Sequence, residues 1–140
     1  MLLIDANIFL EVMLDQARAD ECAAFLAAVD EGAQDAIITD LILDSVLIVM
    51  ERKGKTAPEL ATFLSSIAAY RGLRLHWLSL ADRLRATVRM SGTGLDFEDA
   101  TTAEACRKLS AKGLVSFDRD FDRVPDVRRL EPRDLLPAKR

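Results

Sequence analysis

The sequence predicts an α/β fold in which helices cover both faces of a parallel sheet. Two observations lead to this prediction. Short apolar runs alternate along the whole chain with longer segments of helical periodicity, which is typical of strand–helix–strand units. Most of the short runs are also apolar at nearly every position, as expected for strands buried on both faces of a parallel sheet.

The first part of the chain predicts one strand and two helices. Residues 2–4 form a short apolar run that ends at Asp5 and is typical of a buried strand. Residues 7–14 then have helical spacing. Residues 19–31 predict a stronger helix, because their apolar side chains recur at i, i+3, i+4 and i+7 and Gly32 ends the pattern.

The middle of the chain predicts a second strand over residues 36–39, followed by two helices. Thr39 or Asp40 caps the first of these helices, which extends to about Lys53. The second begins at the sequence Thr-Ala-Pro-Glu over residues 56–59, which has the spacing of a capping box with proline in the first turn.

The last part of the chain predicts two helices and three strands. Residues 73–78 partly alternate between apolar and polar and form the third strand. The helices cover residues 79–90 and 96–111, with a glycine-containing loop over residues 91–94 between them. Residues 114–117 form a fourth strand, and the sequence Val-Arg-Arg-Leu over residues 127–130 forms a short fifth one.

Size and composition are those of an ordinary globular protein. A chain of 140 residues is most simply one domain spanning residues 1–140, with half of its residues apolar and 30% charged. The N-terminus lacks a basic region and reaches a charge at Asp5, so we expect no signal peptide, no membrane association and a cytoplasmic protein. Cys22 and Cys106 lie in helical patterns and are expected to be reduced core residues.

The formal net charge of −4 argues mildly against a nucleic-acid partner. The argument weakens if a group of carboxylates binds cations. A local group of arginines is either a contact for a phosphate backbone or a solvated surface: Arg119, Arg123, Arg128 and Arg129.

Four aspartates stand where predicted strands end or helices begin: Asp5, Asp44, Asp99 and Asp118. The carboxyl ends of parallel strands lie side by side, so carboxylates far apart in sequence can converge at one edge of the sheet. Converging carboxylates repel one another and need Mg²⁺ or Mn²⁺ to remain ionised together at neutral pH. A cation at this edge would activate water against a phosphodiester, so these residues predict a small metal-dependent ribonuclease.

Each aspartate also has a structural alternative. Asp44 interrupts a nearly all-apolar helix, where a buried carboxylate needs a cation, a partner arginine or a role as a first-turn cap. Asp5 either binds a cation or caps the following helix. Asp99 lies one turn into a helix that Asp96 is expected to cap, beside Glu98, which we expect to be solvated.

Three further residues have expected supporting roles. Asn7 orients Asp5, donates to a phosphate or caps a helix. The Ser116 hydroxyl is expected to hold a water or a phosphate near the metal. Asp120 is either a second ligand or, as the turn pattern favours, a residue that shapes the turn after Asp118.

Four stretches of the chain resemble the PIN-domain family, and most closely its VapC-type toxins of toxin–antitoxin pairs: residues 3–7, 39–44, 96–100 and 116–121. The resemblance spans essentially the whole chain. It implies a three-layer α/β/α sandwich with a mostly parallel sheet of about five strands. It further implies a Mg²⁺- or Mn²⁺-dependent endoribonuclease that forms homodimers and binds a small antitoxin, whose C-terminal segment covers the site.

By position, the resemblance assigns the acidic site to four aspartates and supporting roles to four other residues, namely Asp5, Asp44, Asp99 and Asp118, supported by Asn7, Asp96, Ser116 and Asp120. One residue departs from the family pattern. The second acid is usually glutamate, and the shorter Asp44 predicts a ligand that acts through water or a weaker metal site.

Two other classes of α/β protein need residues that this sequence lacks. A haloacid-dehalogenase-type phosphatase needs a second acid two residues after its nucleophilic aspartate, and that position holds Asn7. A phosphate-loop nucleotide binder needs a glycine-rich lysine loop, which the sequence lacks. Two alternatives stay open. One is a stand-alone PIN nuclease for RNA processing. The other is a catalytically weak PIN-like module that binds RNA or protein, and this module is the alternative that Asp44 and the acidic net charge favour.

Overall fold

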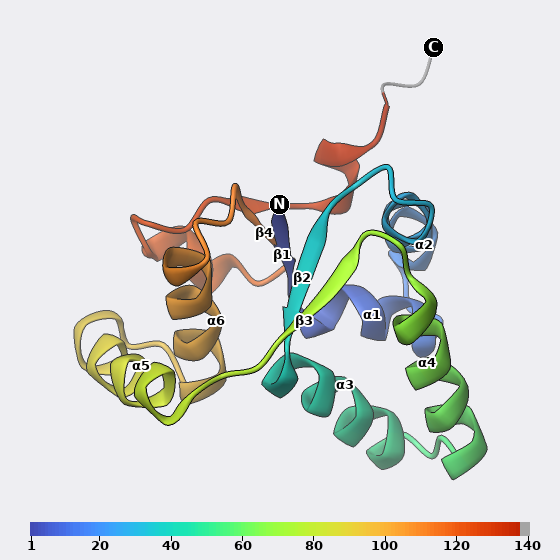
Figure 1. The fold of residues 1–140 in the computed structure, drawn as a ribbon, viewed down its shortest axis with the longest axis horizontal. Helices are drawn as coiled ribbons and strands as arrows, with labels where there is room; N and C mark the ends of the chain where they lie inside the picture. Colours follow the sequence, from blue (N-terminus) through green and yellow to red (C-terminus); the bar gives the residue numbers. More distant parts are fainter. Residues whose placement is uncertain (138–140) are drawn as a thin grey trace.

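A parallel sheet lies at the centre of the computed structural model, which describes residues 1–137. Within these residues the sheet has five strands in the order β3-β2-β1-β4-β5, and every neighbouring pair is parallel (Figure 1). The predicted parallel sheet is therefore confirmed. The strands are β1 (Leu2–Ile4), β2 (Ala36–Thr39), β3 (Leu73–His76), β4 (Leu114–Val115) and β5 (Arg129–Leu130).

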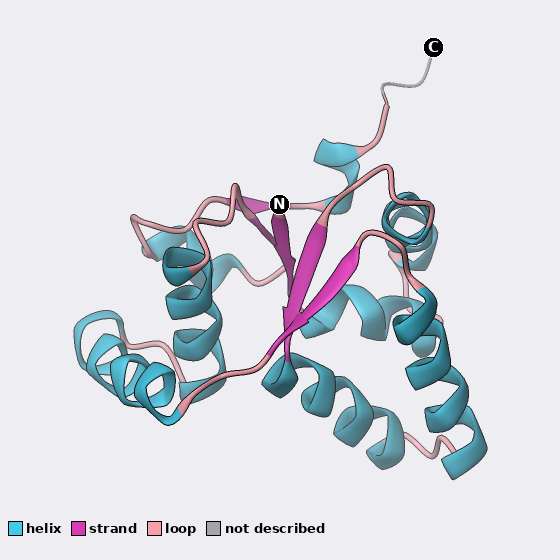
Figure 2. Cartoon of the chain, viewed as in Figure 1, coloured by secondary structure: helices cyan, strands magenta, loops and turns pink. Residues whose placement is uncertain are grey.

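Helices lie on both sides of this sheet, which gives the predicted three-layer α/β/α arrangement (Figure 2). The α-helices are α1 (Ala6–Met13), α2 (Ala19–Asp30), α3 (Asp40–Arg52), α4 (Ala57–Ala69), α5 (Leu80–Thr93) and α6 (Phe97–Lys108). Two short 3₁₀ helices follow β4 and β5, respectively η1 (Arg119–Arg123) and η2 (Pro132–Leu135).

The alternation of side chains along each strand divides the core into two parts. In β1, Leu2 and Ile4 pack into a cluster with buried residues of α1, α2, α3 and α4. Leu3 points to the opposite face and packs with buried residues of α5 and α6 and with Phe121. Both faces of the strand are buried, which explains why its sequence is apolar at every position.

The helix starts agree with the capping residues in the sequence. Thr39 caps α3 by accepting a hydrogen bond from the backbone N–H of Ile42. Thr56 and Ser79 begin α4 and α5 with capping boxes. These side chains satisfy backbone donors that have no partner within the helix, so the start of a helix is readable from local sequence.

Several predicted boundaries differ from the structure. The predicted loop over residues 91–94 is wrong, because α5 continues to Thr93 and ends at Gly94, whose φ of 71° suits a helix C-terminus. Helix α6 ends at Lys108 instead of Ala111, since Ser110 has a φ of 51°. Strand β3 ends at His76, and the backbone N–H of Leu78 donates to the Asp40 carboxylate (2.9 Å) and makes no ladder bond.

Cys22 and Cys106 are both free and buried, as the helical patterns predicted. Within residues 1–137, no helix has the length and apolarity needed to cross a bilayer.

Candidate metal centre

The strand order brings two distant parts of the sequence together at the carboxyl edge of the sheet. β1 lies between β2 and β4. The chain adds β2 and β3 on one side of β1 and then crosses over to add β4 and β5 on the other side. Asp5 follows β1, and Ser116 follows β4; the backbone N–H of Asp5 donates to the carbonyl of Val115 (3.0 Å). In open α/β sheets, binding sites form where strand order reverses in this way.

Asp5 is a buried carboxylate that accepts three hydrogen bonds. Its donors are the backbone N–H of Ala6 (2.8 Å), the hydroxyl of Ser116 (2.7 Å) and the amide of Asn7 (3.3 Å). The side chain is 6% exposed. Burial raises the pKa of Asp5 to about 6, although the hydrogen bonds from Ser116 and Ala6 oppose the rise.

Asn7 and Ser116 connect the loop after β4 to β1. The Asn7 amide nitrogen donates to the Ser116 hydroxyl (3.0 Å), and its amide oxygen accepts from the backbone N–H of Phe117 (3.3 Å). The Ser116 oxygen also accepts from the backbone N–H of Asp118 (3.0 Å). Asn7 therefore orients Asp5, which was one of its three expected roles. Ser116 differs from expectation, because it is fully buried and its hydroxyl donates a hydrogen bond to Asp5.

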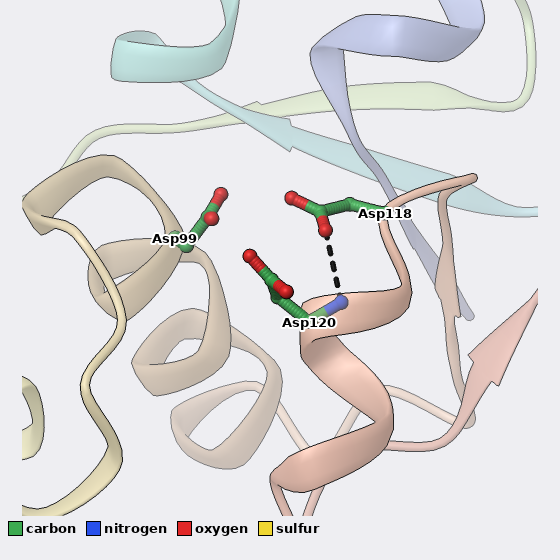
Figure 3. Close-up of side chains that lie close together, drawn as sticks. All are labelled: Asp99, Asp118 and Asp120. Carbon is green, nitrogen blue, oxygen red and sulfur yellow. Dashed lines mark hydrogen bonds between the residues drawn. The ribbon is translucent and has the colours of Figure 1, made fainter.

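Three carboxylates converge beside this network (Figure 3). Asp99 lies in the first turn of α6, Asp118 follows β4, and Asp120 lies at the start of η1. Each offers one oxygen, and the three oxygens lie within 4.8 Å of one another. The backbone N–H of Asp120 donates to the Asp118 carboxylate (2.9 Å), so the turn that carries Asp120 is fixed relative to Asp118.

The environment of Asp99 disfavours its ionised form. Burial, together with the neighbouring charges of Asp96, Asp5, Asp118 and Glu98, raises the pKa of Asp99 to about 7. A bound divalent cation reverses this effect, because it favours ionised carboxylates around it. The set contains only carboxylate oxygens, which are the ligands that Mg²⁺ and Mn²⁺ prefer, so these residues fit such an ion.

Comparison with known proteins shows the family. The model of the PIN domain matches residues 2–127. The chain belongs to the PIN-domain family. No curated protein matches the sequence.

Several solved structures share this PIN fold at low sequence identity. Mycobacterium tuberculosis VapC20, described as a Sarcin-Ricin loop cleaving toxin, has 18% identity and a TM-score of 0.72, with 91% of this chain and 99% of that chain covered. A toxin–antitoxin complex from Klebsiella pneumoniae has 15% identity and a TM-score of 0.71, with 94% and 98% covered. VapBC2 from Rickettsia felis, bound to a promoter DNA fragment, has 14% identity and a TM-score of 0.70, with 93% and 97% covered.

Asp44 differs most from its expected setting in a PIN domain. The prediction that its helix is largely buried is wrong, because Ile42, Val46 and Met50 form a single buried face of α3 and Ile48 is 49% exposed. Asp44 itself is exposed and is not one of the three converging carboxylates. Asp44 is therefore not a buried carboxylate that needs a cation to offset the cost of burial.

Of three further acids, Glu98 differs from expectation, whereas Asp120 and Asp96 take expected roles. Glu98 was expected to be solvated, but it is half-buried and accepts a hydrogen bond from the Ser45 hydroxyl on α3 (2.7 Å). Asp120 shapes the turn through its backbone, as expected, and its carboxylate also joins the cluster. Asp96 caps α6 by accepting from the backbone N–H of Asp99 (2.8 Å), which confirms its predicted role as a cap.

Two of the four arginines grouped in the sequence form ion pairs with acids. Arg129 is held by ion pairs with Asp122 (2.9 Å) and Glu131 (3.0 Å), and it also donates to the carbonyl of Ser116 (3.0 Å). Arg123 pairs with Asp120 at 3.5 Å. Arg129 therefore supports the loop that carries the site, and exposed Arg119 next to Asp118 stays available to a phosphate backbone. Exposed Arg128 precedes β5 and lies at the opposite, amino edge of the sheet, in a pocket with Met1 and Asp35.

Proposed function

We propose that this PIN domain is a Mg²⁺- or Mn²⁺-dependent endoribonuclease and the toxin of a toxin–antitoxin pair. The observation that carries the proposal is the convergence of Asp99, Asp118 and Asp120 at the carboxyl edge of a PIN sheet. Clustered carboxylates with a raised pKa, as at Asp99, are typical of sites that bind a cation or perform catalysis.

Each residue of the proposed site has a definite task. Asp99, Asp118 and Asp120 would hold the divalent cation, and Asp5 adds negative charge behind them. When bound, such a cation lowers the pKa of water and offsets charge on the phosphate during hydrolysis. Asn7 and Ser116 fix Asp5 and the loop of Asp118, while Asp96 fixes the first turn of α6. Asp44, being exposed, has no place in this proposal.

The proposed partners are RNA and a small antitoxin. Structures with the same fold include toxin–antitoxin complexes from Klebsiella pneumoniae and Rickettsia felis. The acidic cluster suits a basic side chain on an antitoxin segment that covers the site, because a cationic group would neutralise the repelling carboxylates. A small antitoxin reading frame beside the gene would favour this toxin over a stand-alone RNA-processing nuclease.

The two free, buried cysteines agree with the proposed cytoplasmic location.

The nuclease is tested by incubating a panel of structured RNAs with the purified, antitoxin-free protein in Mn²⁺, Mg²⁺ or EDTA. We expect cutting in either metal and none in EDTA. Asp118→Asn should lose cutting by about a thousandfold, since it removes a proposed ligand. The matched control is Asp20→Asn, an exposed aspartate in the first turn of α2, which should cut like the wild type.

The same assay distinguishes the enzyme from its main alternative. A catalytically weak PIN-like module that binds RNA or protein is favoured by the exposed position of Asp44 and by the acidic net charge of −4. Binding of RNA without metal-dependent cutting would favour that module. Equal cutting by the wild type and Asp118→Asn would point to a contaminating nuclease and would contradict the proposal.

We also propose that the protein is a homodimer. An apolar stripe is exposed on α5 and just before it, formed by Trp77 (71% exposed), Leu80 (76%), Leu84 (60%) and Val88 (74%). Leu80, Leu84 and Val88 recur every four residues and so share one helix face. A contiguous apolar surface of this kind is typical of an interface, and a second copy of the chain would cover it.

Light scattering coupled to gel filtration tests this assembly. The wild type should have the mass of a dimer, and Leu84→Glu should be a monomer, because a charge would be buried at the centre of the stripe. Leu64→Glu, which changes an exposed leucine on α4, is the control and should stay dimeric. A monomeric wild type at micromolar concentration would contradict the proposed homodimer.

A further inference from the structure

One arginine contacts both ends of the loop that carries two of the three converging carboxylates. This loop, here called the site loop, covers residues 116–122 and begins directly after β4. Arg129 donates from its Nη1 to the carbonyl of Ser116 at the start of the site loop (3.0 Å). It donates from its Nε to the carboxylate of Asp122 at the end (2.9 Å). Both converging carboxylates of the site loop therefore lie, in the sequence, between two contacts to one guanidinium group.

The guanidinium group of Arg129 is in turn held by a chain of ion pairs. Arg129 is 11% exposed, and its Nη1 also donates to one carboxylate oxygen of Glu131 (3.0 Å). The other oxygen of Glu131 accepts from Arg18, which precedes α2 (2.6 Å). The Arg18 guanidinium lies over the ring of Phe117, 3.9 Å from its centroid. The chain from Arg18 to Arg129 therefore contacts the site loop at its backbone, at its last carboxylate and at an aromatic ring.

Contacts at both ends of the site loop matter because its two converging carboxylates repel each other. Asp118 and Asp120 each offer an oxygen to the same small group, and like charges at that separation disfavour the arrangement. A free loop would relieve the repulsion by moving the two carboxylates apart. A planar guanidinium group suits the opposing role, since its donors point in fixed directions and its charge is permanent.

We infer that Arg129, held by Glu131 and Arg18, is a positioning residue that sets the cation affinity of the proposed metal centre by fixing the site loop at both ends. The inference rests on the proposed function. Arg129 acts through the site loop and touches neither the cation nor the RNA. A residue near the C-terminus and one from the connection between α1 and α2 thereby control the separation of the two ligands in the site loop.

Calorimetric titration with Mn²⁺ in the absence of RNA tests this role, because charge and position predict opposite signs. Removing a positive charge near a cation site would by itself tighten cation binding. Loss of positioning weakens it. We expect Arg129→Gln to weaken Mn²⁺ binding about tenfold, as is typical when a group that orients ligands is lost. Arg129→Lys keeps the charge, but its ammonium group does not replace the guanidinium fork, so this variant should also bind Mn²⁺ more weakly than the wild type.

Arg89 offers a matched control elsewhere in the fold. It is 13% exposed and pairs with two acids, Glu104 (3.1 Å) and Asp126 (2.9 Å). Among residues 1–137, its side-chain hydrogen bonds go to these two acids and not to the site loop. Arg89→Gln therefore removes a comparable half-buried cation, and it should change the Mn²⁺ affinity by less than about twofold.

Amide hydrogen exchange in the metal-free protein observes the site loop directly. The backbone N–H groups of Asp118 and Asp120 donate to side chains within the loop, to Ser116 (3.0 Å) and to Asp118 (2.9 Å) respectively. We expect both amides to exchange about tenfold faster in Arg129→Gln, with a much smaller change in the amides of β2. A merely structural role would accelerate exchange in β2 and in the site loop by the same factor.

The outcomes separate failure of the inference from failure of the proposed function. Wild-type or tighter Mn²⁺ binding by Arg129→Gln and Arg129→Lys would overturn the inference and leave the metal centre in place. If Arg129→Gln does not fold, Arg129→Lys decides in the same way. Equal weakening by Arg89→Gln would show that lost stability lowers the affinity, which also contradicts the positioning role. If the wild type itself does not bind Mn²⁺, the proposed function fails and the inference falls with it.

Discussion

Asp99→Asn is expected to stabilise the metal-free protein by about 2 kcal/mol at pH 8 and to abolish its stabilisation by Mn²⁺. Burial and four neighbouring acids raise the pKa of Asp99 to about 7, so ionising this group in the folded protein is unfavourable. One pKa unit corresponds to about 1.4 kcal/mol, which gives an upper limit near 4 kcal/mol; partial exposure to solvent reduces the expected effect to about half. Asparagine has a similar shape and no charge to repel.

The pH dependence of this difference follows from the direction of the shift. A carboxyl group that binds its proton more tightly when folded stabilises the fold fully below its unfolded pKa of about 4. That stability is lost as the pH rises through the folded pKa of about 7. The wild type should therefore match Asp99→Asn near pH 4 and become progressively less stable than the variant up to about pH 8.

Urea unfolding in EDTA across this pH range measures the effect. Added Mn²⁺ should restore the stability of the wild type at pH 8 and leave Asp99→Asn unchanged, because a ligand stabilises only a folded state that binds it. Asp20→Asn serves as the control and should follow the wild type. A variant that is less stable than the wild type at pH 8 in EDTA would show that Asp99 is not under repulsion.

Asp5→Ala is expected to lower the free energy of unfolding by about 3 kcal/mol, whereas Asp5→Asn should lower it by about 1 kcal/mol. Alanine removes the cap of α1 and leaves the buried Ser116 hydroxyl and the Asn7 amide without their acceptor. Asparagine has one oxygen, so it keeps either the contacts with Ser116 and Asn7 or the cap at Ala6, and its NH2 faces the other donor. The raised pKa of Asp5, about 6, further indicates that a neutral group is tolerated there.

Chemical unfolding of the two variants, with RNA cleavage measured in parallel, checks this prediction. Asp5→Asn should be folded and well below the wild type in Mn²⁺-dependent cutting, because it removes charge from beside the metal cluster. Asp5→Ala tests the structural contribution separately. Equal destabilisation by both variants would mean that the charge of Asp5 holds the loop after β4, and that the hydrogen-bond network does not.

The sequence predicted best what depends on local physics. The apolar run over residues 2–4 predicted a strand buried on both faces, and the caps Thr39 and Thr56 predicted where α3 and α4 begin. Satisfying the backbone donors of a first helical turn needs only residues three positions apart, so these features are visible in the sequence. The parallel arrangement followed from the alternation of strands and helices.

The side-chain directions within the site were not predictable in the same way. The all-apolar sequence around Asp44 predicted burial, yet only one face of α3 packs on the core and Ile48 is 49% exposed. A single sequence does not show whether another layer or another chain covers a helix. Glu98 was likewise misjudged, since its setting depends on Ser45 of α3. Both roles considered for Asp120 occur together, because its carboxylate also lies beside Asp99 of α6.

The most direct measurement for the central claim is anomalous diffraction from crystals of the protein soaked with Mn²⁺. The account predicts one or more manganese peaks within coordination distance of Asp99, Asp118 and Asp120, the three residues whose carboxylates converge in Figure 3. The peaks should be missing in Asp99→Asn crystals soaked in the same way. A wild-type crystal with manganese elsewhere, or with none at these carboxylates under saturating Mn²⁺, would contradict the proposed metal centre.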